Sequence, residues 1–195
     1  MNVILGVFLS ILSVICSPTG KVDLVGMSPD GTWAAFSCMD ETGGTTSAYH
    51  TYFVVDMKKA YLFAAYDESD APRALESLGI GMNHIDKLDL QEDSTLVKQR
   101  RGDGTWYLRL KPTTDGYDLE FTPTMETQPI IIYHQAMTGV LGGGTPKYRI
   151  SGALSNKLGM TMFAVRTLIS NSSSKLPDIV YVLDPDARTC YPVQH

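Results

Sequence analysis

The chain has 195 residues, of which 44% are hydrophobic and 19% charged, and its net charge is −5. This composition is typical of a globular protein. The acidic charge gives the protein no electrostatic reason to bind nucleic acid or an anionic membrane surface, so the sequence predicts neither as a partner.

The first sixteen residues predict export. Residues 1–15 carry no charged side chain and are almost wholly apolar, but the run is shorter than the about 20 residues that a membrane-spanning helix needs. Pro18 ends it sharply, which favours a signal peptide over residues 1–16 and one β-rich domain over residues 17–195. Lipidation of Cys16, after a loosely lipobox-like segment, and a buried N-terminal strand or helix are the alternatives.

Residues 24–56 predict two strands around a tight turn, then a polar loop and a third strand. In the turn, Pro29 presets φ, Asp30 can bond its own backbone and Gly31 accepts a positive φ. The apolar strand after the turn runs over residues 32–36.

This unit, SPDGTWAAF followed by YFVVDM, resembles one blade hairpin of the TolB-type β-propeller repeat. It also resembles a small bacterial family of predicted secreted proteins of unknown function. The resemblance implies a β-hairpin and export, and no activity or site residue. A propeller needs about four or more four-stranded blades, so this chain is too short to be one.

Further along, residues 60–66 predict a strand, and a helix is expected after it. Leucines and other apolar residues recur there at helical spacing, from Leu75 through Leu78 to Leu88. Because Pro72 suits a first helical turn and Gly79 interrupts the pattern, we expect a short helix to Leu78 and another turn or two to Leu88.

The second half of the chain again predicts strands, separated by Gly-rich or Asp-rich turns. Among them, residues 129–134 form a continuous apolar run, which predicts a central strand. The expected strands are residues 95–101, 105–111, 117–122, 129–134, 147–151, 160–169 and 178–184. The predicted fold is mainly β, with antiparallel sandwich or barrel-like sheets, one short helical insertion and no full propeller.

A weak internal repeat joins the two ends of the chain. Residues 32–36 and 53–56 resemble residues 161–165 and 181–184, and each unit ends in an Asp before a turn. The sequence therefore suggests two related β units, with chance similarity between two amphipathic hairpins as the alternative.

The three cysteines allow one disulfide. If Cys16 is removed or lipidated, Cys38 and Cys190 remain as a pair in a compartment that permits disulfides. They pair only if the two end units pack together. The alternative is that both are separate buried thiols.

Catalytic motifs are absent from the sequence. It contains no HExxH, CxxC or GxSxG, its four histidines are scattered, and the glycine run at 142–144 lacks the Gly-Lys-Ser/Thr of a phosphate loop. We therefore predict no catalytic, cofactor-binding or metal-binding residue and no cofactor.

Two features suit binding instead. The first is a polar loop made of Asp40, Glu41, Thr42, Gly43 and Gly44, whose acidic pair suits a cation or a basic partner, unless it is only a solvated linker. The second is a set of aromatic residues that form either a platform or ordinary core: Trp33, Tyr49, Tyr52, Trp106, Tyr107 and Tyr117.

The sequence thus favours a non-enzymatic interaction or ligand-binding module in the periplasm or outside the cell. Its expected partner is an unknown protein, peptide or glycan, with membrane attachment only if Cys16 is lipidated. The alternatives are a secreted hydrolase with an unrecognised site and an envelope lipoprotein or structural component. An exposed aromatic patch or an open sheet edge favours binding, whereas a buried cluster of His, carboxylate and Ser favours a hydrolase.

Overall fold

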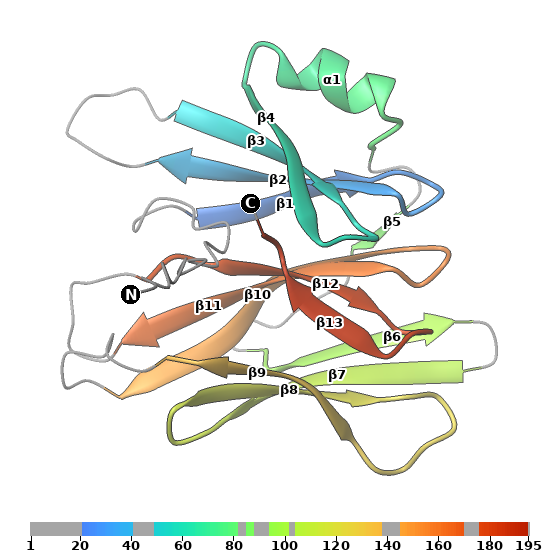
Figure 1. Ribbon diagram of the computed structural model, residues 1–195, viewed down its shortest axis with the longest axis vertical. Coiled ribbons are helices and arrows are strands. Elements are labelled where there is room, and N and C mark those ends of the chain that lie inside the picture. Colours follow the sequence, from blue (N-terminus) through green and yellow to red (C-terminus); the bar gives the residue numbers. More distant parts are fainter. Residues whose placement is uncertain are drawn as a thin grey trace, which may run out of the picture.

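The computed structural model describes residues 21–40, 49–81, 85–87, 94–101, 104–137, 145–169 and 176–194. Within these ranges the chain is mainly β and forms three antiparallel sheets and a single short helix, with no closed barrel or propeller. The predicted fold class is confirmed (Figure 1). Among the same residues, no helix is both long and apolar enough to cross a membrane.

Each sheet contains four strands that follow one another in the chain, and the C-terminal sheet has a fifth strand from an earlier segment. The N-terminal sheet contains β1 (Lys21–Met27), β2 (Trp33–Asp40), β3 (Tyr49–Asp56) and β4 (Tyr61–Asp67). The β6–β9 sheet contains β6 (Leu96–Arg101), β7 (Gly104–Pro112), β8 (Gly116–Thr122) and β9 (Ile130–Ala136). The C-terminal sheet contains β10 (Pro146–Asn156), β11 (Thr161–Ile169), β12 (Ile179–Asp184) and β13 (Thr189–Pro192), with the short strand β5 (Ile85–Lys87) beside β10.

The C-terminal sheet lies between the other two in the stack (Figure 1). Its side chains alternate between the two faces, as they must on any strand. Met162 and Val182 face the N-terminal sheet, where they pack near Phe36. Phe163 and Tyr181 face the β6–β9 sheet. Because both faces of this sheet are covered, its strands are apolar on both sides.

Helix α1 (Ala71–Ser77) covers part of the outer face of the N-terminal sheet, through Leu75 on Val54. Pro72 lies in its first turn, as predicted. The helix ends at Gly79, which has a φ of +65°, and the Ile80 amide donates to the Leu75 carbonyl in a Schellman-type cap.

The predicted helical continuation to Leu88 is wrong in the part that the structure places. Ile85–Lys87 form strand β5, which pairs with β10 opposite Leu154 to Asn156. Helical spacing in this stretch was misleading because the cap at Gly79 ends the helix. Pairing with β10 then fixes the extended conformation of the next placed segment.

The prediction of a central strand at residues 129–134 is also wrong. Among the strands that the structure describes, β9 is the last of its sheet and pairs with β8 alone. Its three isoleucines divide between two environments: Ile130 and Ile132 pack on the core, whereas Ile131 is 61% exposed. A continuous apolar run here reflects a strand with one exposed face.

The two units of the suggested repeat occupy equivalent positions. They supply the second and third strands of the N-terminal and C-terminal sheets. The Asp56 carboxylate accepts bonds from two amides of the following turn, and the Asp184 carboxylate does the same. Four residues after each Asp, Ala60 and Arg188 both adopt a positive φ, of 49° and 56°. The two hairpins therefore share one turn geometry.

The predicted Cys38–Cys190 disulfide is wrong. Cys38 packs in the core between the N-terminal and C-terminal sheets, and it is disulfide-bonded. Cys190 is a free thiol, 1% exposed, in the core between the C-terminal and β6–β9 sheets. The two sulfur atoms thus lie on opposite faces of the C-terminal sheet, which prevents their pairing. Cys16 lies outside the described residues.

Candidate interaction surface

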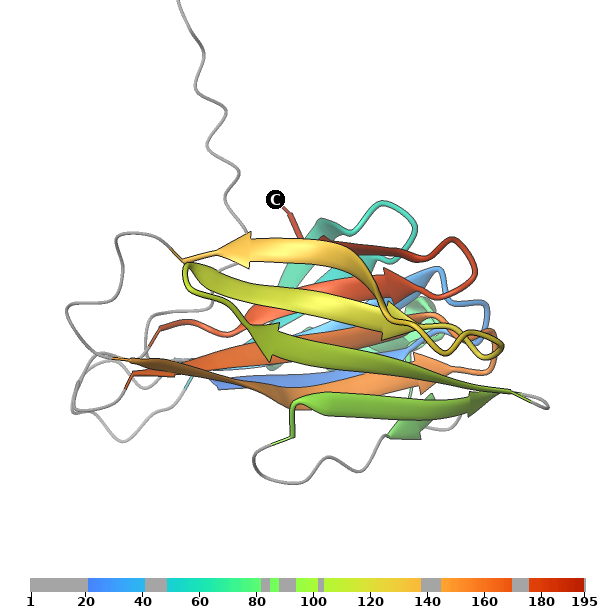
Figure 2. The same ribbon diagram turned by 90° about the horizontal axis from the view of Figure 1, so that it is seen from below.

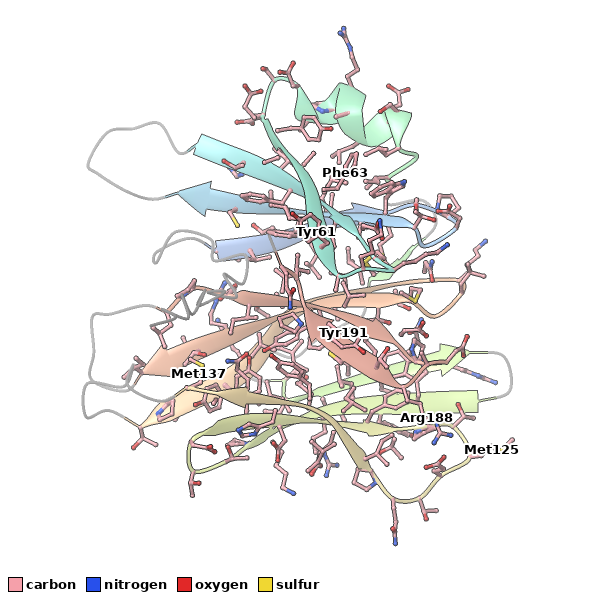
Figure 3. The ribbon with its side chains drawn as sticks, viewed as in Figure 1. Tyr61, Phe63, Met125, Met137, Arg188 and Tyr191 are labelled. Atoms are coloured by element: carbon pink, nitrogen blue, oxygen red, sulfur yellow. The ribbon has the colours of Figure 1, made fainter. Side chains whose placement is uncertain are left out.

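Two exposed aromatic side chains and a half-buried one lie on the outer face of the N-terminal sheet. We call Trp33 of β2 with Tyr61 and Phe63 of β4 the aromatic patch. Tyr61 is 48% exposed and Phe63 56% exposed, and the ring of Phe63 lies 4.7 Å from that of Trp33, tilted by 50°. Figure 3 shows Tyr61 and Phe63 along β4, below α1. Neighbouring exposed aromatics of this kind mark interaction sites.

A β-bulge places Phe63. Val54 pairs with Ala64, but the next residue, Val55, pairs with Leu62, so Phe63 is the extra residue of β4. A bulge redirects the side chain at that position. Here it brings the ring of Phe63 against Trp33.

The turn before β2 places Trp33. The Ser28 hydroxyl accepts a bond from the Trp33 amide at 2.9 Å, and the Ser28 amide donates to the Trp33 carbonyl at 2.8 Å. Asp30 accepts bonds from the Ser28 hydroxyl and from Thr32, which lower the pKa of its carboxyl to about 2. Gly31 has a φ of +69°. The predicted turn is confirmed, and it orients one member of the patch.

Beside the patch, β4 has an open edge, along which none of the other strands in the described ranges is paired. Its other edge pairs with β3 along the strand. On the open edge, the Leu62 amide donates to the Gln194 carbonyl at 2.7 Å, and the Gln194 amide donates to the Ala60 carbonyl at 2.9 Å. Figure 2, which views the stack from below, places β4, β13 and β9 along the same side of the molecule. The last strands of all three sheets therefore share one side.

A cavity of about 500 Å³ opens between turns of the N-terminal and C-terminal sheets. Met57 and Val182 contribute to its apolar lining. Tyr191, which is 54% exposed, also lines it. The carboxylates at its rim, Asp30 and Asp184, already accept bonds within their own turns. In the part of the chain that the structure describes, no three His, Cys, Asp or Glu side chains are grouped so that they could hold a metal ion.

The predicted acidic loop is only partly placed. Asp40 ends β2, where it pairs with Tyr49. Glu41, Thr42, Gly43 and Gly44 lie outside the described residues, as does Cys16.

The histidines that the structure places do not meet. His50 pairs with Met39 inside the N-terminal sheet. His134 lies on β9, where its Nδ1 is 2.8 Å from Asp118. The C-terminal sheet stands between these two strands. His84 and His195 lie outside the described residues.

Of the aromatics singled out in the sequence, Trp33 alone belongs to the patch. Trp106 and Tyr117 are buried in the core, and Tyr107 is 37% exposed on the β6–β9 sheet. Sequence reasoning missed Tyr61 and Phe63. Their two-residue spacing on a predicted strand was the available signal, but their exposure depends on how much of the sheet α1 covers.

No protein-family model, curated protein or solved structure matches this chain.

Proposed function

We propose that this protein is an exported, non-enzymatic binding module that holds a polypeptide partner on its aromatic patch. The supporting observation is the exposure of Tyr61 and Phe63 beside Trp33, on the part of the outer face of the sheet that α1 leaves uncovered. Large aromatic side chains supply most of the binding energy at protein interfaces, and they carry little conformational entropy to lose.

The geometry of the patch favours a peptide over a glycan. The rings of Trp33 and Phe63 tilt by 50° to each other and so form a wedge. With their centroids 4.7 Å apart the two rings touch, so an apolar side chain of the partner packs against their outward faces. A pyranose ring stacks one of its C–H faces on an aromatic ring, which coplanar rings suit better than two rings tilted by 50°.

Peptide selection tests this proposal. A random 12-residue peptide library displayed on phage is panned on the wild-type protein, and enriched peptides are measured by calorimetry against a Tyr61→Ser/Phe63→Ser variant. Loss of two central aromatics costs about 2 kcal/mol or more, so we expect at least about a thirtyfold rise in Kd. The control Tyr107→Ser, at an exposed tyrosine of another sheet, retains wild-type affinity.

Peptides that bind the wild type and the patch variant equally contradict the proposal, provided that both variants unfold at the wild-type temperature. A glycan array that gives patch-dependent binding without any peptide binding contradicts the choice of a polypeptide partner.

Export is tested separately, by mass spectrometry of the protein recovered from its native cells. We expect the chain to begin at Ser17, or at a lipid-modified Cys16. An intact Met1 on that protein rules export by this route out.

A further inference from the structure

We infer that the partner of the aromatic patch docks as an added β-strand on the open edge of β4, with a basic residue facing the acidic end of that strand. This inference rests on the proposed function, because it specifies how the same surface holds its polypeptide. It is carried by the open edge of β4, by the backbone bridge that Gln194 makes to that edge, and by the charges at the end of β4.

The first observation is the unfilled part of the edge. Gln194 occupies the open edge only beside Ala60 and Leu62. From Phe63 to Asp67, the described part of the chain provides no further strand on that side. A row of unpaired backbone donors and acceptors is a template for another strand.

The second observation is that this edge already accepts one backbone bridge from another segment of the chain. Gln194 pairs with Tyr61 in parallel orientation, and its two hydrogen bonds, at 2.7 and 2.9 Å, have ordinary backbone geometry. The described bridge therefore spans Ala60 to Leu62, beside Tyr61 of the aromatic patch, and Phe63 follows it along β4. A partner strand placed at Phe63 continues from that bridge.

The third observation is the distribution of charge. Phe63 lies near the middle of β4, and Asp67, Glu68 and Asp70 follow at its end, all exposed. Asp67 accepts bonds from the Ser69 hydroxyl and the following amides, which lower its pKa and keep it ionised. A peptide with an apolar residue on Phe63 and a Lys or Arg a few residues away complements both ends.

The same features have a competing explanation. A bulge and a charged end are also the devices by which proteins protect a free edge from pairing. The two explanations differ in what they predict for the backbone of a bound peptide, because only an added strand uses its amides at every second residue.

The test is an N-methyl scan of the peptide selected on the wild-type protein. Each backbone amide is methylated in turn, and Kd is measured by calorimetry. We expect a rise of about tenfold at alternate positions, from the loss of one hydrogen bond each, and no change at the positions between. Absence of a two-residue period overturns strand addition.

Charge reversal supplies the second readout. Glu68→Lys/Asp70→Lys is expected to raise Kd for a basic peptide by about tenfold at low salt, whereas Asp23→Lys, on the opposite edge strand β1, leaves it unchanged. If Glu68→Lys/Asp70→Lys and Asp23→Lys raise Kd equally, the basic residue of the peptide does not face the acidic end of β4.

The outcomes separate this inference from the proposed function. If binding requires Tyr61 and Phe63 but the N-methyl scan shows no two-residue period, the proposed function stands and strand addition is rejected. Binding that is independent of the patch rejects both.

Discussion

At the scale of single residues, Gly31 has the strictest conformational requirement. Its φ of +69° disfavours any residue with a Cβ. A Cβ there would also lie 2.4 Å from Nδ2 of Asn156, which belongs to the C-terminal sheet and is 1% exposed. Gly31 therefore serves both the turn that orients Trp33 and the contact between two sheets.

Gly31→Ala is expected to destabilise the fold by about 1–2 kcal/mol through backbone strain, with a further cost from the contact with Asn156. The cycle of Gly31→Ala and Asn156→Ala, measured by urea unfolding, separates the two contributions. The contact part is absent in the Asn156→Ala background, and the strain part remains. Equal free energies of unfolding for wild type and Gly31→Ala would show that this residue is not held at positive φ.

At the scale of elements, the attachment of β9 to its sheet depends on its pairing with β8 and on the titratable side chain of His134. His134 pairs directly with Asp118 of β8, its Nδ1 lies 2.8 Å from that carboxylate, and its Nε2 lies 3.5 Å from Asp115. The hydrogen bond to Asp118, followed by the negative charge of Asp115, raises the pKa of the imidazole. The charged histidine thus fastens the edge strand to β8 and to the turn before it.

The direction of the shift determines the pH dependence. Because the folded-state pKa of His134 lies above its unfolded value of about 6.5, its stabilisation is fully present below that pH and disappears as the pH rises through the folded pKa. His134→Gln should therefore lower the urea midpoint at pH 5.5 and change it little at pH 8.5. Asp118→Asn should reproduce this pattern. A His134→Gln effect of the same size at both pH values contradicts the assignment.

The strands were largely predictable, and their arrangement was not. The bounds predicted for β6, β7 and β8 from turn residues and alternation lie within one or two residues of the observed ones. On β8, for example, Tyr117 and Phe121 alternate with polar neighbours. The edge position of β9 and the pairing of β5 with β10 depend on contacts between distant segments, which no local pattern contains.

The candidate surface was predictable to the same extent. The tight turn and Trp33 follow from local residue chemistry. The exposure of Phe63 does not, because it results from a bulge and from the short reach of α1 across the sheet.

At the scale of the whole molecule, one buried carboxylate joins two sheets. Asp178, 1% exposed just before β12, accepts two hydrogen bonds from Arg166 of β11, at 2.8 and 2.6 Å. It also accepts a bond from the amide of Val22, on β1 of the N-terminal sheet, at 3.3 Å. A charge buried this deeply is stable only while its partners remain in place.

Asp178→Ala removes the carboxylate and leaves the guanidinium of Arg166 and the Val22 amide without this partner. Breaking such a pair costs about 3–5 kcal/mol. The control is an exposed ion pair on β1, the strand of Val22, in which Lys21 lies 2.9 Å from Asp23. Asp23→Ala should cost less than about 1 kcal/mol. Replacing both partners, as Arg166→Met/Asp178→Leu, should recover much of the loss because no unpaired charge remains.

The two tryptophans of the chain report on different sheets, since Trp33 lies in the N-terminal sheet and Trp106 in the β6–β9 sheet. Urea unfolding is therefore followed by the fluorescence of Trp106 in a Trp33→Phe background and of Trp33 in a Trp106→Phe background. The two curves show which sheet loses stability. In Asp178→Ala we expect the Trp33 transition to move to lower urea than the Trp106 transition, because the lost bond is the one that reaches β1. Coincident transitions at the wild-type midpoint would show that this carboxylate does not couple the sheets.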